Sequence, residues 1–240
     1  MDDKMLKTGQ IQKALVEAGF NPEEELLNLE SSGSGFEVAR IRIDHKDSGK
    51  HRLYIDHGEN YLGGDTQEET LPASTFQAVV FAEQNIRALW AEGEALPICS
   101  GIDGKPMVND PVSGSCLNCE QAIIGQGKCK PKIRLWLLLK KDGQIRPFVM
   151  SLSPTSIKHW NQHKRKLKRS KLPVVAVTTA FSLQDVKKNS YRWAEVLFDV
   201  AGTPSVEILQ TAKHARDELD RVMQDITVRD FEDPGEQSGS

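Results

Sequence analysis

The sequence predicts a mainly β protein with flanking helices, an α+β fold built on a small antiparallel barrel that a cysteine-bearing loop interrupts. Three observations support this fold class. Several segments alternate apolar and polar residues with a period of two, and a segment with helical periodicity lies between the later ones. All four cysteines fall within a Gly/Pro/Asn/Asp-rich stretch, residues 97–131, which has little apolar surface of its own to bury.

We expect three parts in the chain. Residues 1–35 form a helical appendage that ends in a flexible Ser/Gly joint and is suited to self-association. Residues 36–226 form the barrel domain, with the cysteine-bearing insertion at 97–131. Residues 227–240 form a disordered acidic tail. The start of the sequence is charged rather than apolar and the longest apolar run is too short to span a bilayer, so we expect no membrane contact and a cytoplasmic location in a bacterial cell or a phage-infected host.

Charge is segregated along the sequence. The net charge is only −3, but residues 128–171 carry many lysines and arginines against the single acid Asp142, while both ends of the chain are acidic. A solvated helix face would explain the basic run at 164–169 taken alone. A one-signed segment that spans strands and a helix instead favours a polyanionic partner.

The first strands are expected at residues 36–43 and 51–56, joined by the turn at 46–50. Alternation places isoleucines and leucines on one face of this hairpin. The opposite face carries Arg40, Arg42, Arg52 and Tyr54. We expect a loop over residues 58–74, then a strand from residue 76 that runs into irregular structure or a short helix near residue 90.

The cysteines predict a metal site. They are Cys99, Cys116, Cys119 and Cys129, and the pair separated by two residues allows one turn to present two thiolates to the same ion. Four sulfur ligands fill a tetrahedral zinc ion and leave no position for water, so the zinc would be structural. Two disulfides, a redox Cys-x-x-Cys motif and an iron–sulfur cluster are the alternatives.

Residues 132–152 form the clearest hairpin, because Asp142 and Gly143 suit a two-residue turn. If Lys141 pairs with Gln144, the apolar residues between positions 133 and 152 share one face, which is core. The other face holds Lys132, Arg134, Trp136 and Lys140. We interpret this face as exposed, with Trp136 available for stacking; a buried Trp136 would need a partner for its N–H, and a three-residue turn would reverse the faces.

A helix is expected from Ser153, an N-cap followed by proline, to about Arg169. Helical spacing assigns Trp160 to the core. The basic side chains that would face water or phosphate are Lys164, Arg165, Lys168 and Arg169. A strand pair, 174–183 and 191–200, follows, with Tyr191 and Trp193 directed outward, and then an amphipathic helix from about residue 204.

Together, the expected outer faces mix cations with aromatic rings. Cations neutralise phosphates and rings stack on unpaired bases, so the combination predicts single-stranded DNA as the ligand, on a barrel of the oligonucleotide-binding (OB) type. The segment from Cys99 to about Val200 resembles the zinc-containing single-stranded-DNA-binding (helix-destabilising) proteins of T4-like phages. The motifs are the Cys-x-x-Cys loop SCLNC and the basic strand KPKIRLWLLLK that follows it. The resemblance implies a non-enzymatic role in replication, recombination or repair, with partner proteins recruited by the acidic end DFEDPGEQ.

Two other functions remain open at this stage. One is a zinc-ribbon adaptor for transcription or assembly, whose basic segment contacts an acidic protein or duplex DNA. The other is a metal-dependent nuclease that uses the repeated Ile-Asp-His tripeptide, with Asp44, His45, Asp56 and His57 as its candidate residues.

Overall fold

The computed structural model describes residue 16 and residues 38–44, 51–59, 66–71, 74–92, 97–123, 126–141, 143–189 and 191–222. The chain divides into two units, Met1–Glu37 and Val38–Ser240, and every element below belongs to the second. The predicted acidic tail at 227–240 and, apart from Val16, the predicted helical appendage lie outside the described residues.

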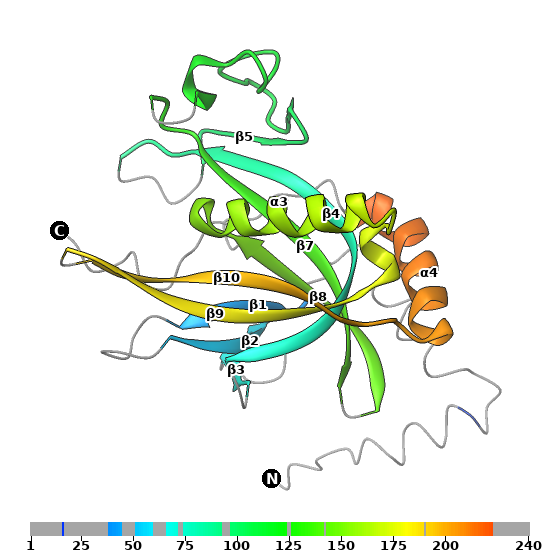
Figure 1. The fold of residues 1–240 in the computed structure, drawn as a ribbon. Helices are drawn as coiled ribbons and strands as arrows, with labels where there is room; N and C mark the ends of the chain where they lie inside the picture. Colours follow the sequence, from blue (N-terminus) through cyan, green and yellow to red (C-terminus); the bar gives the residue numbers. More distant parts are fainter. Residues whose placement is uncertain are drawn as a thin grey trace, which may run out of the picture. The chain divides into compact units, whose positions relative to one another are not determined.

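The second unit is mainly β, as predicted, and its sheet curls strongly into half a barrel (Figure 1). The strands are β1 (Arg40–Asp44), β2 (Arg52–Glu59), β3 (Thr66–Thr70), β4 (Thr75–Leu89), β5 (Cys99–Ile102), β6 (Lys105–Pro106), β7 (Lys130–Lys141), β8 (Gln144–Leu152), β9 (Thr178–Lys188) and β10 (Tyr191–Gly202). The helices within the described ranges are α3 (Pro154–Arg169) and α4 (Val206–Val222), with short 3-10 turns η1 (Glu120–Ala122) and η2 (Val174–Ala176). No helix in these ranges combines the length and apolarity that crossing a bilayer requires.

Strand β4 connects the parts of the sheet. The strand order is β10-β9-β4-β7-β8-β1-β2-β3, and β5 pairs with both β4 and β6. The start of β4 pairs with β9, its remainder with β7, and its end also with β5. The predicted strand from residue 76 to about residue 90 is confirmed as β4, which its neighbours hold extended as far as Leu89. The predicted loop at 58–74 contains β3, and the predicted strand at 174–183 begins only after η2.

The predicted antiparallel pairing has one exception, because β1 meets β8 in parallel, with Arg40 opposite Val149. The hairpin of β7 and β8 has the predicted register, with Lys141 opposite Gln144. Its turn includes Gly143 at a φ of +81°, in the left-handed region that glycine adopts without steric cost.

The inner face of the sheet forms the larger core. Side chains of β1, β2, β4, β7 and β8 meet those of β9 and β10 there, and α3 packs over them through Trp160. Phe181 and Phe198, opposite each other on β9 and β10, form an edge-to-face pair at 5.2 Å. The core also contains the apolar faces that alternation predicted for the β1–β2 hairpin and for the β7–β8 hairpin.

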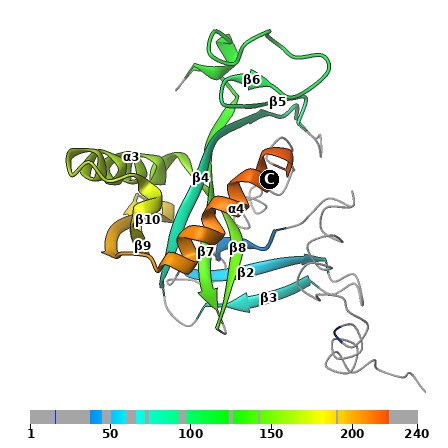
Figure 2. The ribbon, with the colours of Figure 1, turned by 90° about the vertical axis from the view of Figure 1, so that its right-hand side faces the viewer.

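The outer face of β4, β7 and β8 is also buried, because α4 lies across these strands (Figure 2). Ala212 of α4 is in the same apolar cluster as Phe81, Trp136 and Val149. Trp136 is only 3% exposed. The sequence placed Trp136 correctly on the face opposite the main core but wrongly predicted that this face is exposed.

Helix α3 is fixed to the sheet by polar contacts as well as by apolar ones. The indole N–H of Trp160 donates to Glu83 of β4 at 2.7 Å, and Lys164 donates to the same carboxylate at 2.6 Å. The prediction that Trp160 belongs to the core is confirmed, since it is 0% exposed. On the same buried side of α3, the hydroxyl of Ser156 accepts a hydrogen bond from the backbone N–H of Val196 in β10 at 3.0 Å.

Candidate nucleic-acid interface and cysteine cluster

Four of the candidate DNA-binding residues are buried: Tyr54, Lys132, Arg134 and Trp136. The predicted exposure of these side chains is wrong. Arg134 Nε and Trp136 Nε1 both donate to the side-chain oxygen of Gln84 on β4, at 2.9 and 3.1 Å, and the Arg134 guanidinium lies 5.3 Å from the centre of the Trp136 ring. Gln84 thus supplies the buried partner that the indole N–H needs, which the sequence alone did not identify.

The candidates on β1 and β2 are divided between exposed and engaged side chains. Arg42 is mostly buried and forms an ion pair with Asp56 at 2.7 Å, Arg40 is half-buried, and Arg52 is exposed. In the paired strands Asp56 lies opposite Arg40, whereas Asp44 lies opposite Arg52, four residues away. At about 3.3 Å per residue these two carboxylates are separated by roughly 13 Å along the strand.

The nuclease set is therefore not assembled among the residues described. His57 is exposed, and alternation directs it to the face opposite that of Asp56. His45 lies outside the described residues. Nothing in the placement of Asp44, Asp56 and His57 brings them to one metal ion.

Helix α3 presents cations to solvent. Arg165, Lys168 and Arg169 are exposed, whereas Lys164 is half-buried against Glu83. Lys140, at the end of β7, is exposed on a separate hairpin. The sequence of α3, PTSIKHWNQHKRKLKR, contains no acidic residue, so the helix contributes no negative charge to offset these cations.

The tip of the β9–β10 hairpin combines rings and cations. Tyr191 is 75% exposed and lies directly opposite Lys188. Trp193, half-buried, follows two positions later on the same strand and so shares the face of Tyr191. On the reverse face, Lys187 and Arg192 are exposed and directly opposite each other, a like-charge pair that is unfavourable without an anion nearby.

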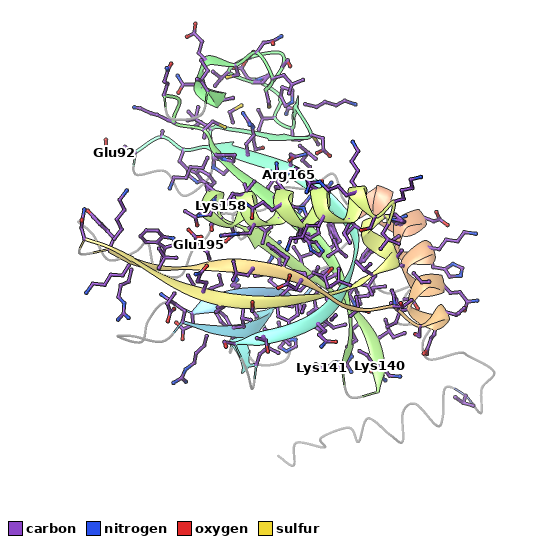
Figure 3. The ribbon with its side chains drawn as sticks, viewed as in Figure 1. Glu92, Lys140, Lys141, Lys158, Arg165 and Glu195 are labelled. Carbon is purple, nitrogen blue, oxygen red and sulfur yellow. The ribbon has the colours of Figure 1, made fainter. Side chains whose placement is uncertain are left out.

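Glu195 of β10 connects Trp193 of this surface to helix α3. Its carboxylate is buried and accepts hydrogen bonds from Trp193 Nε1 at 3.2 Å and from Lys158 Nζ of α3 at 3.0 Å, while His159 Nε2 lies 2.7 Å away. Figure 3 shows Lys158 and Glu195 together where α3 lies beside β10. Burial raises the pKa of Glu195, but the hydrogen bonds from Lys158, His159 and Trp193 outweigh it and hold this pKa below its ordinary value.

This lowered pKa gives a pH dependence to stability. The charged form of Glu195 stabilises the folded state above the ordinary pKa of 4.5, and that contribution is lost as the pH falls through the lower folded-state pKa. We therefore expect wild-type protein to exceed Glu195→Gln in unfolding free energy at pH 7, and the gap to shrink below about pH 4.5. Urea unfolding of both proteins from pH 7 to pH 3 measures it; a constant gap would contradict the assigned contacts.

The four cysteines lie in the module of residues 97–129, between β4 and β7. All four line one small cavity of about 20 Å³, together with Arg87, Gln121 and the backbone around them. The thiols are not joined by disulfides. Within the described ranges, no three cysteine, histidine or acidic side chains are already in a metal-binding arrangement. The four predicted ligands therefore line the same cavity, but their side chains are not arranged as the ligands of a bound metal ion.

Electrostatics and packing both reflect this proximity. Burial raises the pKa of Cys129 to about 11; Arg87 lowers it, and the other three thiols raise it further. Burial also raises the pKa of Cys116. A metal ion would therefore have to displace thiol protons at neutral pH. Gly101 of β5 is required for this packing, because a Cβ atom at that position would collide with Cys116 Sγ.

No protein-family model, curated protein or solved structure matches this chain. The resemblance drawn from the cysteine spacing and the basic strand stays a prediction. Function has to follow from the side chains described above.

Proposed function

We propose that this protein binds single-stranded DNA and serves replication, recombination or repair without catalysing a reaction. The observation that carries the proposal is the exposed ring of Tyr191 beside Trp193 on one face of the β9–β10 hairpin. Lys188 flanks the rings from β9 and Lys158 from α3. This is the described surface that best retains the predicted combination of cations and rings.

The spacing of the two rings suits an unpaired base. Residues two apart on a strand are about 6.8 Å apart, and side chains stand roughly perpendicular to the sheet. Stacked bases are about 3.4 Å apart, so the gap between Tyr191 and Trp193 matches one base with a ring on each side. Paired bases cannot enter such a gap, which favours a single strand over a duplex.

The OB-type barrel is part of the same proposal. A strongly curled sheet with a helix packed over its inner core supports it, and the open half-barrel leaves a long strand pair projecting with the ring of Tyr191 exposed. The nucleic acid would contact the end of β9 and β10 rather than the faces of β1, β2 and β7 that the sequence favoured.

We also propose that Cys99, Cys116, Cys119 and Cys129 hold one zinc ion. Four thiols facing one cavity fit the ligand set of a structural site, and the ion would draw together a module that contains little regular structure between β6 and β7. With four sulfur ligands the ion would have no position for a reacting water, so it would brace the fold and take no part in hydrolysis.

Tyr191→Ala tests the stacking surface. We expect it to weaken binding of a poly-dT oligonucleotide by about 1–3 kcal/mol, the range for loss of one base–aromatic stack. Tyr191→Phe is the matched control, because it keeps the ring and removes only the hydroxyl. Fluorescence anisotropy with a labelled strand gives both affinities.

The same assay with single and double strands over a salt series tests the ligand class. Steep salt dependence with a strong preference for the single strand supports the proposal. Equal loss of affinity in Tyr191→Ala and Tyr191→Phe, or tighter binding of duplex, would contradict it.

A protein-binding adaptor is the second candidate, because the cysteine module exposes several apolar side chains. Leu117, inside the Cys-x-x-Cys turn, is 83% exposed, and Ile98, Val112 and Ile123 are exposed as well. All four belong to the cysteine module, and an exposed apolar patch on it would mark a contact surface for another protein. Absence of any binding to single strands in the anisotropy assay would favour this candidate.

A further inference from the structure

Helix α3 runs alongside β10 in the same direction. Two ion pairs show this: Lys158 with Glu195 at 2.8 Å and Lys166 with Asp199 at 3.7 Å. Eight helical residues rise about 12 Å and four strand residues about 13 Å, so the two elements stay in step over this length. A ligand that leaves the hairpin tip toward the body of the protein therefore meets α3 from its first turns onward.

The outward side of α3 carries a stripe of polar side chains. Lys158, Gln162, Arg165 and Arg169 recur at intervals of three and four residues, which places them on one side of the helix, and all four are exposed. The buried residues Trp160 and Leu167 lie on the opposite side. Figure 3 shows Lys158 next to Glu195 and Arg165 farther along the same helix.

This stripe is unusual for a surface helix because it contains basic side chains and no acidic one. Solvent-exposed helices commonly pair opposite charges at positions four apart, and like charges there repel. Arg165 and Arg169 are such a like-charged pair. A row of phosphates along the helix would turn this repulsion into attraction.

We propose that a single strand held between Tyr191 and Trp193 continues along the outward stripe of α3, with its phosphates on Arg165 and Arg169. The inference rests on the proposed function and adds the direction and length of the binding path. From Tyr191 to Glu195 the strand spans about 13 Å, and from Lys158 to Arg169 the helix spans about 16 Å. The path of roughly 30 Å holds at most about nine nucleotides at a rise of 3.4 Å each.

The test compares short and long oligonucleotides. In the Arg165→Gln/Arg169→Gln variant, we expect the slope of log K against log salt for a twelve-residue oligo-dT to become shallower by about 1.4, because each phosphate that an arginine no longer neutralises reduces it by about 0.7. Binding of a four-residue oligo-dT, which at 3.4 Å per residue fits the roughly 13 Å of the hairpin tip alone, should change by less than twofold. The exposed positions of both arginines leave the core intact, which a thermal melt checks.

The matched control is Lys105→Gln/Lys128→Gln, which removes two exposed charges from the cysteine module. An equal reduction of the slope in this control, or an unchanged slope in the α3 variant, would overturn the path along α3. If Tyr191→Ala loses binding to both oligonucleotides while the α3 variant has no effect, the stacking surface on the hairpin is supported and only the path along α3 is rejected. Unaltered binding in Tyr191→Ala would instead count against the proposed function.

Discussion

Replacing Cys116 by serine is expected to abolish binding of the single zinc ion that we propose for the cysteine module. Cys116 is the most buried of the four cysteines, and its sulfur lies against Gly101 and the common cavity. A serine oxygen is a poor substitute for a thiolate in a structural zinc site, and metal binding and folding of such a module are coupled. Metal analysis should find one zinc per chain in the wild type and almost none in the variant.

The matched control is Leu117→Ser, which changes the adjacent, exposed residue of the same turn. It should keep its zinc. Limited proteolysis should cut the cysteine module in Cys116→Ser faster than in this control, because the module would lose its brace. Wild-type protein that contains no metal while its thiols remain free would contradict the zinc proposal, and a coloured, iron-containing protein would favour the cluster instead.

The second large effect is expected for Trp160→Ala, which should lower the free energy of unfolding by about 3–5 kcal/mol. The indole is fully buried, packs edge-on against Phe198 with ring centres 5.1 Å apart, and donates to Glu83. Truncation would leave a cavity between α3 and the sheet and remove one of the contacts that fix the helix. Urea unfolding followed by circular dichroism measures the loss.

Trp160→Phe separates the two contributions. It keeps most of the apolar volume and removes the N–H, so we expect a smaller loss, of about 1–2 kcal/mol. A loss below about 1 kcal/mol for Trp160→Ala would show that α3 is not anchored through this side chain.

Local patterns in the sequence predicted the elements that depend on local interactions. The turn at Asp142 and Gly143 determined the register of β7 and β8, and Ser153 with Pro154 located the start of α3. The core position of Trp160 and the exposure of Tyr191 also followed from periodicity. In each case a few neighbouring residues determine the result.

The predictions that were wrong depend on contacts between distant segments. Alternation shows that Trp136 lies on the face opposite the main core. Whether that face is buried depends on α4, which comes much later in the sequence and packs over it. The role of Glu195 was missed because an acid in an alternating strand is ordinarily exposed, and its partner Lys158 belongs to a different element.

The hydroxyl of Ser156 has a consequence for how this protein meets other copies of itself. In the described sheet β10 is the edge strand on one side. An edge strand with free backbone N–H and C=O groups can pair with a strand of another molecule, which leads to aggregation. Occupation of the Val196 amide by a helix hydroxyl interrupts that row of donors midway. A second chain could then join only a short stretch of β10, so the same helix that would guide a nucleic acid also helps keep the molecules apart.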